Sequence, residues 1–268
     1  MRRWIVALVV TIVAAIAALM LIRAASQSAS PQPSVSSLPR TPDGQPNLNG
    51  VWQVLATASW DIQDHPAQKG VPAGQGVVEG NEIPYQPWAL AKKQENVKNR
   101  LTADLVEARG FLPGVPRIMY MPLPFQIVQT PKYVTMVYEY GHAVRVIYTD
   151  GTKHPEGPIE FWLGDSRGRW EGDTLVSDVV HFNAETWFDK VGNFHSEALH
   201  LVERFTLMGP DHINYEVTVE DPKVFTRPWK MSMPLYRRKE PNVRILEYEA
   251  GALMEEDAEK PEEQIKSK

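Results

Sequence analysis

Residues 200–219 read HLVERFTLMGPDHINYEVTV, two alternating runs joined by a short turn. In the second run apolar side chains stand at positions 213, 215, 217 and 219, and polar ones at 214, 216 and 218. A period of two is typical of a strand with one buried face, and Gly209-Pro210 between the runs is turn chemistry. The stretch therefore predicts an antiparallel β-hairpin with one face in a core.

Strands of the same kind are predicted on both sides of this hairpin. They are Tyr133–Tyr140, Ala143–Tyr148, Arg169–Trp170, Thr174–Phe182, Trp229–Tyr236 and Arg244–Tyr248. Successive hairpins form a meander, and a long meander hides its edges most simply by closing on itself. Asn49-Gly50-Val51-Trp52 also resembles the Gly-x-Trp opening of lipocalins. We therefore expect an all-β fold, an antiparallel up-and-down barrel of the lipocalin or calycin type, with a two-sheet sandwich as the alternative.

One helix is predicted on the N-terminal side of these strands. Gln86–Arg109 mixes spaced apolar residues with lysines and glutamates, and Pro87 stands near its start, where proline is tolerated. We expect a single helix over this range.

The start of the chain predicts a membrane segment. Arg2 and Arg3 precede an unbroken apolar run, Trp4–Ile22, which is long enough to cross a bilayer as a helix. Paired arginines stay in the cytoplasm and direct the following chain outward. We expect residues 1–23 to be a transmembrane anchor or a signal peptide, with residues 4–22 in the membrane. The domain would then lie in the periplasm or outside the cell, anchored to the inner membrane, or secreted if cleavage occurs among the small residues 24–29.

The rest of the chain divides by composition. Residues 24–46 are rich in proline and serine and predict an extended linker. Residues 47–250 form the expected β-barrel-like domain, and residues 251–268 an acidic, disordered tail.

Composition excludes several classes of function. The net charge of -5 gives no reason to expect a nucleic-acid partner. The chain has no cysteine, which excludes disulfides, thiol nucleophiles and iron–sulfur clusters. It also lacks phosphate-loop, dinucleotide and calcium-loop motifs, so nucleotide-driven chemistry is not expected.

Several phrases spread over the domain resemble a large family of exported bacterial proteins without an assigned activity. They are Pro46-Asn47-Leu48-Asn49-Gly50-Val51-Trp52, Pro113-Gly114-Val115-Pro116-Arg117, Gln129-Thr130-Pro131, Trp170-Glu171-Gly172-Asp173-Thr174-Leu175, His195-Ser196-Glu197-Ala198-Leu199-His200 and Asp221-Pro222-Lys223-Val224-Phe225-Thr226-Arg227-Pro228-Trp229. The resemblance implies export and a β-rich, barrel-like domain, and it implies no chemistry.

The richest candidate site surrounds His195. If residues 195–205 are extended, His195, Glu197 and Glu203 share a face with apolar neighbours that look like core. Burying carboxylates there costs several kcal/mol each unless they are paired, protonated or bound to a metal. One interpretation is a base and its orienting carboxylate, with Asp189 as a further partner, or a weak metal site. The other is structural: Glu203 pairs with an arginine such as Arg145, and His195 lies in a loop near the rim.

Three further groups of residues complete the candidates. His154, in a turn after Asp150-Gly151, is placed to act as an acid or base at the barrel mouth. A formal G-x-S-x-G at residues 164–168 is followed by strand residues instead of a helix, which argues against a hydrolase elbow. Four aromatic residues are expected either to fill the barrel or to line a ligand cavity: Trp170, Trp187, Trp229 and Tyr215.

These observations favour a barrel that binds a small, largely apolar molecule outside the cytoplasm. The alternative is an enzyme of the same fold, a hydrolase, isomerase or lyase that uses His195, Glu197, His154 or Asp189. A scaffold for a membrane-protein partner is the third option. The sequence assigns no cofactor, no metal ligands and no oligomeric state.

Overall fold

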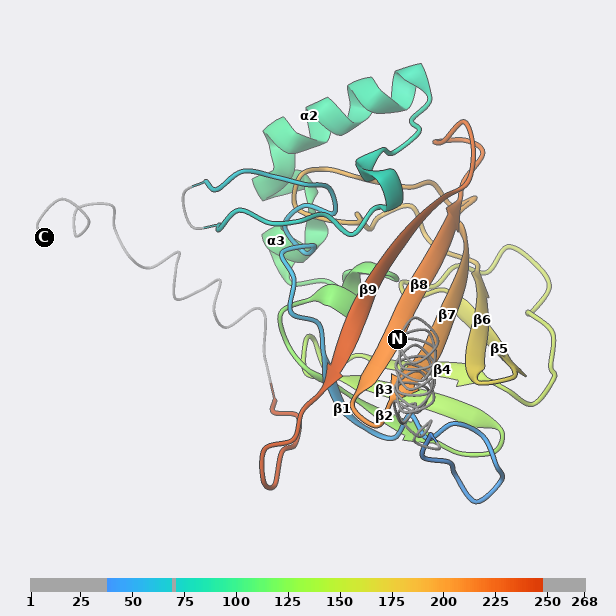
Figure 1. The fold of residues 1–268 in the computed structure, drawn as a ribbon. Helices are drawn as coiled ribbons and strands as arrows, with labels where there is room; N and C mark the ends of the chain where they lie inside the picture. The colour runs from blue at the N-terminus through green and yellow to red at the C-terminus, as the bar shows by residue number, and fades with distance from the viewer. Residues whose placement is uncertain (1–37, 69–70, 248–268) are drawn as a thin grey trace, which may run out of the picture. The chain divides into compact units, whose positions relative to one another are not determined.

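Nine strands close into a barrel in the computed structural model, which describes residues 38–68 and 71–247 (Figure 1). The strands follow one another around the barrel in chain order, and β9 pairs with β1 to close it. They are β1 (Gly50–Gln53), β2 (Phe125–Gln129), β3 (Tyr133–Tyr138), β4 (Val144–Tyr148), β5 (Asp165–Glu171), β6 (Thr174–Val180), β7 (His200–Gly209), β8 (His212–Glu220) and β9 (Trp229–Arg237). The predicted closed barrel is confirmed, and the predicted hairpin of residues 200–219 is β7–β8, paired from His200↔Glu220 to Gly209↔His212.

The prediction of a purely antiparallel, up-and-down barrel is wrong at one joint. β4 and β5 are parallel, with Ile147 opposite Ser166 and Tyr148 opposite Arg167, whereas the other neighbouring pairs are antiparallel. Residues 149–164 therefore return along the barrel before β5 begins. The turn signal at Asp150-Gly151 is real, but the Pro- and Gly-containing stretch after it forms no strand, so no hairpin partner follows β4.

The predicted strand Arg244–Tyr248 is also not formed. Residues 244–247 have no strand structure, and Tyr248 lies outside the described residues. Both edges of β9 are already paired, with β8 on one side and β1 on the other. A closed barrel leaves no edge for another strand.

The predicted single helix Gln86–Arg109 is divided into two. α2 spans Pro87–Ala103 and α3 spans Leu105–Arg109. Asp104 causes the break, because its carboxylate accepts a hydrogen bond from the Val106 amide and two from the buried guanidinium of Arg117. An aspartate side chain readily caps the N-terminus of a helix. Asp104, which also forms the ion pair with Arg117, therefore ends α2 and begins α3.

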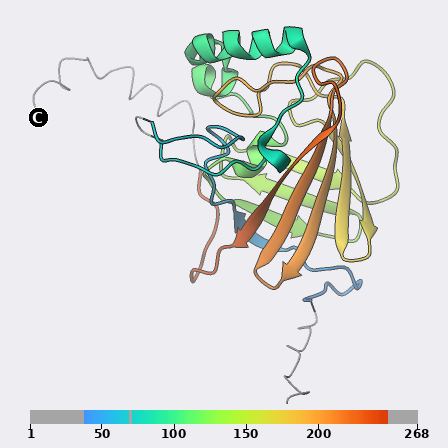
Figure 2. The ribbon, with the colours of Figure 1, turned by 45° about the horizontal axis from the view of Figure 1, so that its top comes forward.

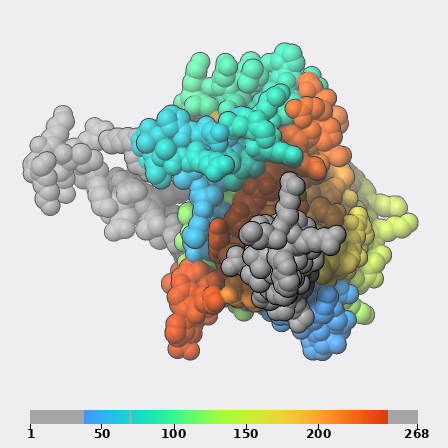
Figure 3. All heavy atoms as spheres, viewed as in Figure 1, coloured from blue at the N-terminus to red at the C-terminus, as the bar shows by residue number. Residues whose placement is uncertain are grey.

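The helices and the long connections cover one end of the barrel (Figure 2). The α2 residue Asn96 donates a hydrogen bond at 3.2 Å to the carbonyl of Gly192, in the connection between β6 and β7. In Figure 3, α2 and the segment before it form one layer with the connection between β8 and β9. The Gln86 amide donates to the Val224 carbonyl and the Thr226 amide to the Pro84 carbonyl, which joins these two segments.

The regions predicted to flank the domain lie mostly outside the described residues. These include the apolar run 4–22 and the tail 251–268. No helix within residues 38–68 and 71–247 is long and apolar enough to cross a membrane. The last part of the predicted linker is described: Arg40 pairs with Asp173 at 2.7 Å, on the turn between β5 and β6.

The barrel interior holds a buried ion pair. Arg145 and Glu203 are no more than 2% exposed, and the Arg145 Nη1 donates to Glu203 Oε1 at 2.9 Å. Tyr215 donates its hydroxyl to the same carboxylate at 2.8 Å, and Arg145 also donates to the Ser166 hydroxyl. Thus the structural interpretation of Glu203 is confirmed.

The surrounding groups keep Arg145 charged. Burial alone would lower the pKa of Arg145, but the charge of Glu203 and its hydrogen bonds outweigh burial and raise that pKa. Burial, together with the Glu203 charge, raises the pKa of the Tyr215 hydroxyl well above its usual value, so it stays a donor. Hydrogen-bonded, oppositely charged partners are the condition under which buried charges are tolerated.

We expect Glu203→Gln to destabilise the fold severely. The glutamine leaves the Arg145 charge buried and unpaired, which costs roughly 3–5 kcal/mol. The matched control is Arg204→Ala on the same strand, which removes an exposed ion pair with Glu171 and costs at most about 1 kcal/mol. Urea denaturation gives both free energies of unfolding, and equal losses in the two variants would contradict the role of the pair.

Candidate functional site

The connection between β4 and β5, residues 149–164, is fastened to the outside of the barrel, and we call it the strap. It has almost no regular secondary structure, so individual side-chain and backbone contacts hold it in place. Near its start, Arg167 of β5 donates to the Thr152 hydroxyl at 2.6 Å. Near its end, the Phe161 amide donates to the His181 carbonyl at 2.8 Å. A strap fixed at both ends forms a stable wall beside the strands that it crosses.

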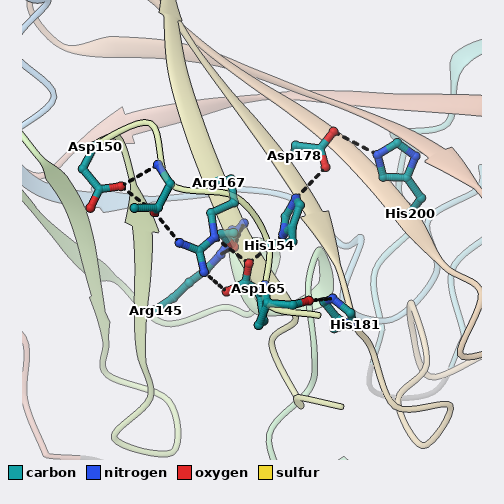
Figure 4. A network of polar contacts seen from close by, with 11 residues as sticks. Arg145, Asp150, His154, Asp165, Arg167, Asp178, His181 and His200 are labelled. Carbon is teal, nitrogen blue, oxygen red and sulfur yellow. Dashed lines mark hydrogen bonds and ion pairs between the residues drawn. The ribbon is translucent and has the colours of Figure 1, made fainter. Parts of the chain in front are cut away.

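His154 is the central attachment of the strap (Figure 4). Its Nδ1 lies 2.6 Å from Asp165 Oδ2 on β5, and its Nε2 lies 2.9 Å from Asp178 Oδ1 on β6. Both contacts are hydrogen bonds only when both ring nitrogens carry hydrogen, as they do in the charged imidazolium. Burial raises the pKa of Asp165, but hydrogen bonds from Arg167 and His154 outweigh burial and lower it. The strap is thus held by charge-assisted hydrogen bonds.

The same row of polar groups continues across two more strands. Asp178 Oδ2 lies 3.1 Å from His200 Nε2 on β7, and His200 Nδ1 lies 3.2 Å from Glu220 on β8. The strand register explains this, because His200 and Glu220 are paired residues whose side chains point outward. We call the five residues Asp165, His154, Asp178, His200 and Glu220 the His–carboxylate chain.

A pocket of about 430 Å³ lies between the strap and the ends of β6 and β7. Three segments that are distant in sequence line it: Pro158, Ile159 and Glu160 of the strap; Val180, His181 and Phe182; and Glu197, Ala198, Leu199 and His200. The lining is mainly apolar, with two imidazoles and two carboxylates. Mainly apolar walls with a few polar groups are typical of small-molecule sites.

His181 has an unusual conformation in this pocket. Its backbone φ is +63°, in the left-handed region that costs energy for residues other than glycine. Its Nε2 lies 3.0 Å from the Pro155 carbonyl, so this nitrogen carries the hydrogen. In the neutral ring the Nδ1 then has a free lone pair and accepts hydrogen bonds. His181 therefore joins the strap to the end of β6 and retains one acceptor.

His195 lies in the connection between β6 and β7, as the structural interpretation expected, but it is buried and 2% exposed. Its Nε2 is 2.7 Å from the Thr186 hydroxyl, and its Nδ1 is 2.9 Å from the Ser196 carbonyl. Burial lowers its pKa, so the ring is neutral at pH 7. Phe182 and Phe188 pack against the ring.

Glu197 and Asp189 have partners of their own. Glu197 is exposed, pairs with Lys223 and lines the pocket. The expected extended run from residue 195 is interrupted by a turn in which the Leu199 amide donates to the Ser196 carbonyl, so the alternation that predicted an inward Glu197 begins only at β7. Asp189 is fully buried and accepts hydrogen bonds from Asn193 and from the Ile62 amide. Thus His154, Asp189, His195 and Glu197 each bind different partners and do not converge.

The four predicted ligand-binding aromatic residues belong mainly to the packed interior. Tyr215 is fully buried beside Glu203, and Trp229 packs against Phe188 and Phe225 at ring distances of 5.6 and 5.4 Å. Trp187 is buried, and Trp170 is half-buried against the core. None of them lines the pocket beside the strap.

Within the described residues, no group of three or more histidine, aspartate or glutamate side chains is arranged to hold a metal ion. The His–carboxylate chain is extended, and each imidazole nitrogen faces an oxygen. A metal would need those nitrogens as ligands.

No protein-family model matches the chain, and a search of the curated proteins finds no match.

We expect His154→Ala to loosen the strap without unfolding the barrel. Each lost charge-assisted hydrogen bond is worth roughly 1.5–3 kcal/mol, enough to raise local opening by at least about tenfold. Hydrogen exchange should then be faster at strap amides such as Phe161 and unchanged in β7 and β8. Lys153→Ala, next to it in the strap, is the control. Unchanged exchange in His154→Ala would contradict the attachment.

Asp189 is expected to make stability depend on pH. Burial, the largest effect, raises its pKa from 3.8 to about 7 despite hydrogen bonds from Asn193 and Ile62 that lower it. The folded state therefore keeps a proton that the unfolded state has released. Stability should fall as pH rises through this range, by at most about 1.4 kcal/mol per pH unit.

Asp189→Asn tests this, because asparagine does not titrate. The free energy of unfolding of the variant, measured from about pH 5 to about pH 7, should fall less steeply than that of the wild type. Burial lowers the pKa of His195, so His195 makes stability rise with pH below its usual pKa. This residue is present in both proteins, so the comparison isolates Asp189. Identical slopes would show that Asp189 does not titrate in this range.

Proposed function

We propose that this protein is an exported β-barrel that binds a small, largely apolar molecule in the pocket between the strap and β6–β7. The pocket is the observation that carries the proposal. Its volume of about 430 Å³ is within the range of about 300–1,000 Å³ typical of small-molecule sites. Pro158, Ile159 and Val180 supply apolar contact area, and His181 and His200 supply polar contacts.

The barrel interior is a less suitable ligand site. Its centre is occupied by Arg145 and Glu203, and aromatic rings such as Phe205 and Tyr215 pack beside them with ring centroids 5.0 Å apart. A ligand in that space would have to displace a hydrogen-bonded ion pair, which costs several kcal/mol. The proposed site therefore lies on the outside of the barrel, where the strap provides a second wall.

Export rests on the sequence. The apolar run Trp4–Ile22 behind Arg2 and Arg3 supports an inner-membrane anchor with the barrel in the periplasm or outside the cell. The motif resemblance to exported bacterial proteins supports the same location.

An enzyme is the second candidate, and one observation favours it. The Thr186 hydroxyl lies 2.7 Å from Nε2 of His195, whose other nitrogen donates to a carbonyl. This is the contact that a hydroxyl nucleophile makes with its base. Both residues are 2% exposed, so a substrate would reach them only after the connection between β6 and β7 opens. Catalysis by Thr186 and His195 is therefore the second candidate, after ligand binding.

Native mass spectrometry of the full chain, purified after export, tests the binding function. We expect an additional mass of a few hundred daltons that is lost on denaturation. Ala198→Trp fills the proposed pocket and should abolish the additional mass.

The control is Ala73→Trp, which fills a different pocket, of about 460 Å³, between residues 54–57, residues 73–77 and β9. Retention of the ligand by Ala198→Trp and its loss in Ala73→Trp would place binding at the second pocket and contradict the proposal.

A further inference from the structure

Four carboxylates surround the proposed pocket, and three of them have basic partners. Glu160 and Glu197 line it directly, and Asp178 and Glu220 lie behind it, each bonded to His200. Glu197 pairs with Lys223, and Asp178 is bonded to His154 as well as to His200. Among the described residues, Glu160 is therefore the carboxylate of this site that has no basic partner.

Glu160 is the carboxylate with the most freedom to bind a ligand. It is exposed on the strap and has no hydrogen bond or ion pair with any residue in the described part of the chain. Its neighbours in the pocket wall, Pro158 and Ile159, are apolar. A charge beside apolar wall residues attracts an opposite charge more strongly than the same charge in open water.

The imidazoles of His181 and His200 do not offset the negative charge of Glu160. His200 lies between Asp178 and Glu220, so a proton on its ring is already neutralised by its own partners. His181 donates from Nε2 to the Pro155 carbonyl, which leaves Nδ1 as an acceptor in the neutral ring. An acceptor at His181 and a carboxylate at Glu160 both suit a ligand that donates hydrogen bonds.

We propose that the pocket takes an amphipathic cation, a small molecule with an apolar body and an ammonium or amidinium group. The apolar body would lie against Ile159 and Val180, and the charged group would lie beside Glu160. A carboxylate or phosphate ligand would meet a like charge at Glu160, which disfavours binding. This inference rests on the proposed function and adds the ligand class to it.

Three probes of nearly equal size and shape test the ligand class: 2-phenylethylammonium, 2-phenylethanol and phenylacetate. Isothermal titration calorimetry of the full chain at low salt should give at least tenfold tighter binding of the ammonium than of the alcohol. Phenylacetate should bind more weakly than both. Added salt should reduce the advantage of the ammonium, because a partly exposed ion pair is screened.

Glu160→Gln should remove most of the ammonium's advantage and leave the alcohol's affinity unchanged. Glu156→Gln is the matched control, since Glu156 is exposed on the same strap and does not line the pocket. Equal binding of the three probes, tighter binding of phenylacetate, or no binding of the ammonium would overturn the inference.

Ala198→Trp separates this inference from the proposed function. If probes bind to the wild type without preference for the cation and Ala198→Trp abolishes binding, the pocket is a ligand site and the charge argument is wrong. If Ala198→Trp leaves ammonium binding unchanged, the probe binds elsewhere, and both the pocket and the charge argument fail.

Discussion

The ion pair between Arg145 and Glu203 is the constraint on which the rest of this barrel depends. Two charges inside a closed sheet are stable only when each is hydrogen-bonded, so Tyr215 and Ser166 must lie beside them, and no bulky apolar residue can replace these partners. The pair fixes which faces of β4 and β7 point inward, because a shift of one residue would move both charges to the outside. Together with the apolar core it occupies the interior, so the proposed ligand site lies on the outer surface.

The parallel joint between β4 and β5 has the largest effect on that outer surface. A parallel pair needs a connection that returns along the barrel, and here that connection is the strap. Because the strap lacks regular structure, its position depends on His154, held between Asp165 and Asp178. The pocket exists where the strap passes the ends of β6 and β7, so one topological departure from a simple meander generates both the attachment and the proposed site.

Sequence patterns predicted the parts of the fold that local alternation determines. The β7–β8 hairpin and the closed barrel follow from a period of two. Of the two interpretations left open for Glu203, the structure shows the ion pair with Arg145. The parallel joint, the helix break at Asp104 and the turn before β7 were missed, since each depends on tertiary contacts that no local period records. The pocket could not be predicted, because its walls come from three separate segments. His154 was singled out, but its contacts with Asp165 and Asp178 depend on the path of the strap, which no local pattern predicts.

The pairing of β1 with β9 has a consequence for how the chain can be connected. Trp52 lies opposite Arg237, so the first and last strands of the barrel are neighbours in the same ring. Ring closure depends on which strands meet, and not on where the polypeptide starts. A circular permutant that begins within the strap, runs from β5 to β9 and continues through a short linker into β1 would therefore contain every strand contact of the natural barrel.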